Sequence, residues 1–99
     1  MVAYVILASK PGQFRTEPGP DLQPVEAYDY LFYGRKRAHY VIAAMEHASK
    51  VRIVEESGSA TVNLVPSKFL PTFGTLEEAR EELKQLASFG SMDISLVKL

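Results

Sequence analysis

The architecture of this chain depends on one segment, Lys36-Arg37-Ala38-His39-Tyr40-Val41-Ile42-Ala43-Ala44-Met45-Glu46-His47-Ala48-Ser49. Its apolar residues recur at the spacing of one helix face, at Ala38, Val41, Ile42, Met45 and Ala48. At 100° per residue they span an arc of about 120°, and the alanine, methionine and glutamate content favours helix. The segment therefore predicts a helix over residues 36–49. An extended strand is the alternative, because residues 39–42 also have strand propensity.

The chain on the N-terminal side of this segment divides into three parts. Residues 2–9 are short and apolar and end before Pro11-Gly12, which is typical of a central strand. Residues 10–27 hold four of the six prolines and predict a long mobile loop without regular structure. Residues 28–34 are rich in aromatic side chains and predict a short strand at a sheet edge.

The C-terminal side shows clearer local signals. Two β-branched runs, 51–56 and 60–65, flank a turn that contains Gly58 and predict a β-hairpin. An irregular connection between Pro66 and Pro71 follows. Residues 75–88 predict a helix, with Thr75 as N-cap and Glu78 completing a capping box. Gly90 is the expected C-terminal cap, and residues 91–99 alternate as in a strand.

These elements predict one α+β domain over residues 1–99. Without the proline-rich insert and its short extra strand, the order is βαββαβ, which resembles a ferredoxin-like fold. Both helices would then cover one face of a four-stranded antiparallel sheet and leave the other face open. If residues 36–49 are extended instead, the fold becomes a larger antiparallel sheet with the single helix 75–88.

Composition restricts the class of function. The net charge is −1, from 11 basic and 12 acidic residues, which argues against a nucleic-acid binder. There is no cysteine, so disulfides and thiolate metal sites are excluded and a cytoplasmic location is favoured. The apolar run at the N-terminus is shorter than the roughly 20 residues of a membrane helix, so no membrane association is expected.

Three groups of residues are candidates for binding. Arg35, Lys36 and Arg37 form a run of cations that suits an anion. An aromatic group predicts a small-molecule pocket or an interface and comprises Tyr28, Tyr30, Phe32, Tyr33 and His39. Apolar side chains in irregular or edge segments predict docking of a partner, namely Phe14, Phe69, Leu70 and Phe73.

Catalytic and metal motifs are absent from the sequence. It contains no phosphate-binding loop, nucleophile elbow or HExxH motif. His39 and His47 are eight residues apart, too far along a helix to bind one metal, so we expect neither metal nor cofactor.

The function favoured by these observations is a non-enzymatic binding or accessory module that self-associates or docks on a protein partner. One alternative is a small dimeric α+β-barrel enzyme that acts on an aromatic or acidic small molecule. A second alternative is an anion or nucleotide sensor that uses residues 35–37.

Overall fold

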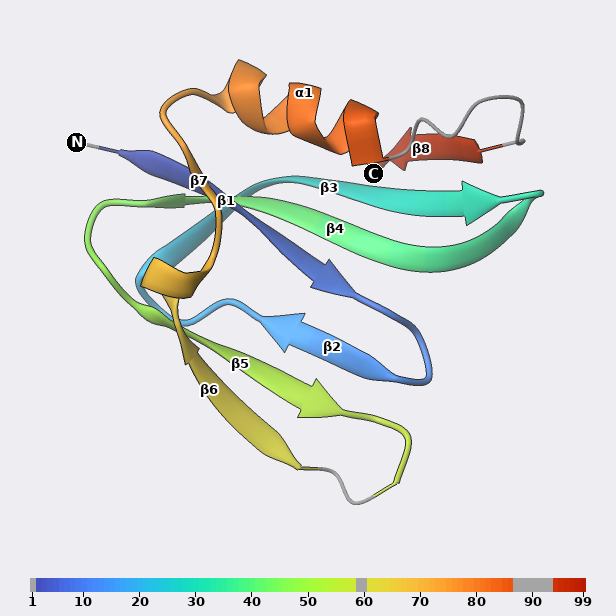
Figure 1. The fold of residues 1–99 in the computed structure, drawn as a ribbon, viewed down its shortest axis with the longest axis horizontal. Helices are drawn as coiled ribbons and strands as arrows, with labels where there is room; N and C mark the ends of the chain where they lie inside the picture. The colour runs from blue at the N-terminus through green and yellow to red at the C-terminus, as the bar shows by residue number, and fades with distance from the viewer. Residues whose placement is uncertain (1, 59–60, 87–93) are drawn as a thin grey trace.

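The computed structural model describes residues 2–58, 61–86 and 94–99. These residues form a small α+β fold with one α-helix and two antiparallel sheets (Figure 1). In chain order the elements are β1 (Ala3–Ser9), β2 (Phe14–Glu17), β3 (Leu22–Phe32), β4 (Arg35–Met45), β5 (Lys50–Glu55), β6 (Val62–Pro66), a short 3-10 helix (Ser67–Phe69), β7 (Thr72–Phe73), α1 (Leu76–Leu86) and β8 (Ile94–Lys98). Among the described residues, no helix has the length and apolar content needed to cross a membrane.

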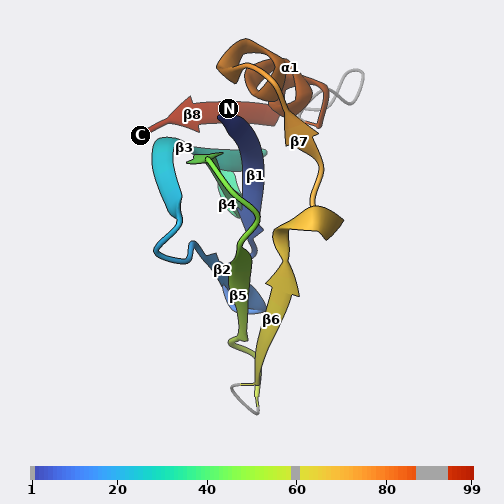
Figure 2. The same ribbon diagram turned by 90° about the vertical axis from the view of Figure 1, so that its left-hand side faces the viewer.

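Other elements pack against both faces of the larger sheet. It has five strands in the order β7-β1-β4-β3-β8, and the smaller sheet has three in the order β2-β5-β6. α1 lies across one face of the larger sheet, and the smaller sheet lies on the opposite side (Figures 1 and 2). The core accordingly has two parts. Ile42 of β4 is buried against Ala79 and Leu83 of α1. A second cluster lies between the sheets and consists of Val5, Leu7, Leu22, Ala43, Met45 and Val51.

The helix predicted over residues 36–49 is wrong, because residues 35–45 form β4 at the centre of the larger sheet. Ile42 packs beneath α1, whereas its neighbour Ala43 packs between the sheets. A strand buried on both faces carries a continuous apolar run instead of alternating polar and apolar residues. The apolar residues of this run in β4 also recur at the spacing of one helix face, which is why the sequence predicted a helix.

The ferredoxin-like order is therefore not found, since its first helix is replaced by a strand. The alternative of a larger antiparallel sheet with a single helix describes the five-stranded sheet and α1, although residues 87 and 88 of the predicted helix lie outside the described residues. The second sheet was not predicted. It arises because part of the segment predicted as a loop becomes strand.

Residues 10–27, predicted to lack regular structure, contain β2 and the start of β3. Pro24 is accommodated inside β3 because the pairing with β4 shifts between Pro24 and Glu26. The hydrogen-bond ladder is interrupted at such a bulge, so the missing backbone N–H of a proline is tolerated there. β2 is in turn fastened to β1, since the Thr16 amide donates to Ser9 Oγ at 2.9 Å and its hydroxyl donates to the Ala8 carbonyl.

The aromatic segment is also placed differently from the prediction. It belongs to the eleven-residue strand β3, which lies between β4 and β8 and not at a sheet edge. The strand is interior because β8, from the other end of the sequence, pairs with it from Tyr28↔Lys98 to Phe32↔Ile94.

Predictions that rest on local signals are confirmed. Residues 3–9 form β1, and the hairpin is formed by β5 and β6. Thr75 is the N-cap of α1, since the Glu78 amide donates to Thr75 Oγ1 at 3.1 Å. The Glu78 carboxylate accepts from the Gly74 amide at 3.2 Å, one residue before the amide expected in the predicted capping box. β8 confirms a strand over residues 94–98, whereas Gly90 and residues 91–93 lie outside the described residues.

A buried carboxylate fastens α1 and β8 to β3. The side chain of Glu26 is only 6% exposed. It accepts two hydrogen bonds from the Arg80 guanidinium, and it lies 3.1 Å from Lys98 Nζ and 2.7 Å from the Tyr28 hydroxyl. The hydrogen bonds from Arg80 hold the pKa of Glu26 far below its usual range, so the carboxylate stays charged.

Candidate interaction surface

The outer edge of β6 is the most exposed apolar part of the smaller sheet. Val62 is 46% and Leu64 60% exposed. They stand opposite Val54 and Arg52 of β5, on the face of the sheet that also carries Arg15 and Glu17 of β2. This face points away from the larger sheet, because the other face contributes Val51 to the core between the sheets. The two side chains therefore form an apolar strip along the outer strand.

The backbone of the same strand has hydrogen-bonding groups directed outward. The Glu55 amide donates to the Thr61 carbonyl at 2.9 Å, and the Ser67 amide to the Ser49 carbonyl at 2.8 Å. In an antiparallel ladder, alternate residues point their N–H and C=O groups to the same neighbour. Asn63 and Val65 therefore face β5, while Val62 and Leu64 direct their backbone groups to the other side. β6 is the last strand of this sheet among the described residues.

The opposite edge of the smaller sheet is protected by charge. Arg15 of β2 lies 3.0 Å from Glu17 and 3.4 Å from Glu56, and Arg52 lies 3.7 Å from Glu17. Charged side chains on an edge strand discourage pairing with another chain. β6 contains no charged residue in Val62-Asn63-Leu64-Val65-Pro66, so its edge lacks this protection.

Of the four residues predicted to dock a partner, one is fully available. Phe69 is 70% exposed on the short 3-10 helix that follows β6, with Lys68 Nζ 5.3 Å from its ring centre. Phe14 is half-buried at the start of β2. Leu70 packs against the core between the sheets, and Phe73 packs beneath α1. The prediction did not include Val62 and Leu64, although the lack of charge along residues 62–66 was a signal available in the sequence.

The predicted aromatic group does not form one pocket. Tyr28 packs beneath α1, and Tyr30 makes an edge-to-face contact with Tyr40 on the same side of the sheet, their ring centres 6.2 Å apart. Phe32 and Tyr33 contact each other at the tip of the β3–β4 hairpin, with ring centres 4.7 Å apart. His39 points to the other face, opposite Asp29.

The three consecutive cations are also separated. Tyr30 pairs with Ala38 but Leu31 pairs with Lys36, so Arg37 is the extra residue of a β-bulge. Lys36 turns to the face of Asp29, with Nζ 3.2 Å from its carboxylate. Arg37 lines a hollow on the opposite, α1-bearing face. Lys36 and Arg37 therefore lie on opposite faces of the sheet.

An unexpected polar group lies on the face opposite α1. His39 Nδ1 is 2.9 Å from Asp29 Oδ1, and Lys36 contacts the same oxygen. The hydrogen bond from His39, followed by that from Lys36, lowers the pKa of Asp29. The sequence could not indicate this partner for His39, because the pairing exists only when residues 35–45 are a strand.

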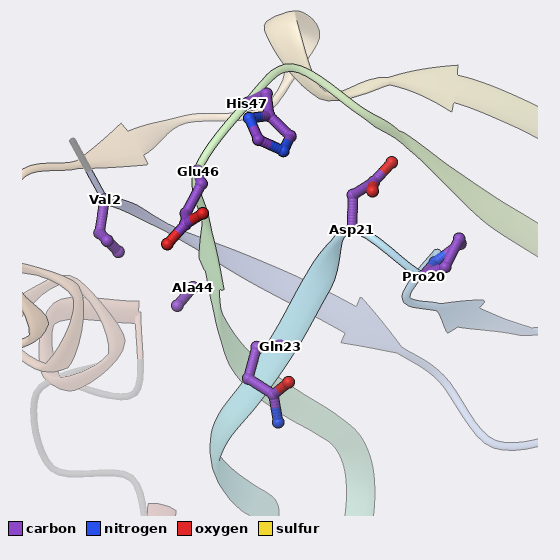
Figure 3. A pocket seen from close by; sticks show the side chains of 7 residues that line it. All are labelled: Val2, Pro20, Asp21, Gln23, Ala44, Glu46 and His47. Atoms are coloured by element: carbon purple, nitrogen blue, oxygen red, sulfur yellow. The ribbon is translucent and has the colours of Figure 1, made fainter.

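A hollow of about 440 Å³ at the other end of β3 and β4 collects acidic groups and a histidine. Figure 3 shows the carboxylates of Asp21 and Glu46 pointing away from each other, and the Gln23 amide pointing away from both. Across residues 2–58, 61–86 and 94–99, no three histidine or acidic side chains are grouped so that they could hold a metal ion. The hollow thus offers no convergent set of ligands.

Comparisons of the chain with protein-family models, with curated proteins and with solved structures return no match.

Proposed function

We propose that this chain is a non-enzymatic binding module that self-associates through the outer edge of β6. The observation that supports the proposal is the combination, on one uncharged edge strand, of outward backbone groups and two exposed apolar side chains. An exposed strand edge is a template for pairing with another strand. The lack of cysteine is in keeping with the cytoplasmic location proposed for the module.

The position of Pro66 selects one way for two copies to pair. A two-fold axis at Leu64 would place Val62 opposite Pro66 of the second copy, which has no N–H to donate. An axis at Asn63 places Val62 opposite Leu64 of the second copy, and all outward N–H and C=O groups of these residues then have partners. The same pairing brings the apolar side chains of both copies together on one face.

The direct test is the concentration dependence of molecular mass, measured by sedimentation equilibrium. We expect the chain to associate in the micromolar range, since an edge contact buries little area. Leu64→Lys places a charge on the edge, and Leu64→Pro removes one outward N–H without removing a bond to β5. Both substitutions should leave a monomer.

Val25→Lys is the matched control, because Val25 is 44% exposed and belongs to β3, outside the smaller sheet. This variant should associate like the unmodified chain. A monodisperse monomer at several hundred micromolar would contradict self-association, and so would dimers that persist in both Leu64 variants.

A further inference from the structure

The hollow that Arg37 lines has a volume of about 370 Å³ and lies on the α1-bearing face of the larger sheet. Its floor is Ala38, a buried residue with a small side chain. On one side of Ala38 stands its pairing partner on β3, Tyr30. On the other side lies Lys10, because the residue before it, Ser9, pairs with His39. A small residue between two long ones leaves a depression in the sheet surface, and Leu86 at the end of α1 closes one side.

The β-bulge in β4 aims Arg37 into this hollow. In regular alternation Arg37 would share a face with His39 and lie opposite to Ala38. The bulge shifts the pairing by one residue, so Arg37 lines the same hollow as Ala38, while Lys36 occupies the other face beside Asp29. Bulges frequently re-aim a side chain next to a binding site.

The second cation, Lys10, is held by a tight turn. Its amide donates to the Phe14 carbonyl at 2.9 Å, and its carbonyl accepts from Gln13 and Phe14, each at 3.0 Å. Gly12 has a φ of 79°, which only glycine adopts readily, so the turn is well defined. The backbone of Lys10 is therefore fixed before any ligand binds.

Two tyrosines line the hollow and supply aromatic rings and uncharged hydroxyl groups. The rings of Tyr30 and Tyr40 meet edge-to-face, at an interplanar angle of 84°. Burial, together with the nearby Tyr30, raises the pKa of Tyr40, so its hydroxyl stays protonated and able to donate a hydrogen bond.

Among the described residues, no acidic side chain lines the hollow, and neither Lys10 nor Arg37 has a side-chain ion pair or hydrogen bond. Lys10, in the turn after β1, and Arg37, in β4, both line the hollow together with Tyr30 and Tyr40. Pockets for small ligands begin at about 300 Å³, so the volume suits a compound with one or two rings.

We propose that this hollow binds a small aromatic carboxylate. Arg37 and Lys10 hold the carboxylate, and the ring lies against Tyr40 and Leu86. The hollow shares no residue with the edge of β6, so this proposal is independent of self-association.

The test is a titration with 2-naphthoate, followed by amide chemical shifts and by calorimetry, with uncharged 2-naphthamide as the control compound. We expect 2-naphthoate to shift the amides around residues 10–13 and 37–40 and to bind at least about tenfold more tightly than 2-naphthamide. Arg37→Gln should weaken binding of 2-naphthoate about tenfold or more. Ala38→Leu should abolish it by filling the floor, in a protein shown to be folded by circular dichroism.

Lys36→Gln is the matched control, since it removes the adjacent cation on the other face and should change the affinity less than twofold. Leu64→Lys should also bind the probe normally, which separates this result from that of the β6 edge. Equal affinity for the two compounds, equal losses in Arg37→Gln and Lys36→Gln, or no amide shifts at millimolar 2-naphthoate would each overturn the proposal.

Discussion

At the scale of single residues, Glu26 joins three elements that are far apart in the sequence. Its carboxylate, on β3, is bound by Arg80 of α1 and Lys98 of β8. A buried carboxylate is stable only when its partners replace the lost water, and here Tyr28 supplies a further donor. Nothing in the neighbourhood of residue 26 in the sequence indicates these partners. The pairing depends on the tertiary arrangement.

Replacing Glu26 with glutamine should destabilise the fold by about 2 kcal/mol, the size of a charged hydrogen bond to a partly exposed partner. The free energy of unfolding, measured by urea denaturation at pH 7, checks this value. Glu77→Gln is the control, because the exposed Glu77 also approaches Arg80, at 3.8 Å. That substitution should change stability by less than about 0.5 kcal/mol. Equal losses for both variants would contradict the role given to Glu26.

The lowered pKa of Glu26 predicts how the stability of the fold depends on pH. The folded pKa of Glu26 is lowered from an ordinary value of 4.5. Its contribution is therefore fully present above about pH 5 and is lost as the pH falls through the folded value, because the unfolded chain takes up the proton first. Asp29, whose pKa is also lowered, acts in the same direction. Urea unfolding at pH 6, 4 and 3 should show a smaller decline for Glu26→Gln than for the unmodified chain; an unchanged decline would contradict the prediction.

At the scale of elements, β4 explains why the helix prediction was wrong while the hairpin and α1 were found. The hairpin and the N-cap of α1 are made by residues within a few positions of each other, so their signals are local. The conformation of β4 depends on packing partners at Val5, Leu22 and Leu83, which are distant in sequence. Its helical propensity is overridden by burial on two faces.

Two neighbouring alanines test this assignment. Ala43 has no exposed surface between the sheets, so Ala43→Leu should overpack the core and cost about 1–3 kcal/mol. Ala44 points to the opposite face and lines the hollow of Figure 3, so Ala44→Leu has room and should cost much less. Thermal unfolding of the two variants gives the comparison. Similar losses at both positions would contradict an extended β4.

At the scale of the whole molecule, the two candidate sites lie in different layers. The apolar edge belongs to the smaller sheet, and the hollow lies on the α1-bearing face of the larger one. Of the candidate residues from the sequence, Arg37 and Tyr30 line the hollow, and Phe69 is exposed on the short 3-10 helix that follows β6. Their grouping could not be predicted, because the bulge in β4 sends Lys36 and Arg37 to opposite faces.

The elements that could be predicted from the sequence are those whose stabilising contacts are short-range, namely β1, the β5–β6 hairpin, the capped start of α1 and the final strand. The extended conformation of residues 35–45, the presence of β2 and the start of β3 in residues 10–27, and the grouping of side chains on each face follow only from the folded arrangement. Burial on both faces and strand pairing are set by residues tens of positions away, and local propensities of well under 1 kcal/mol per residue cannot outweigh them.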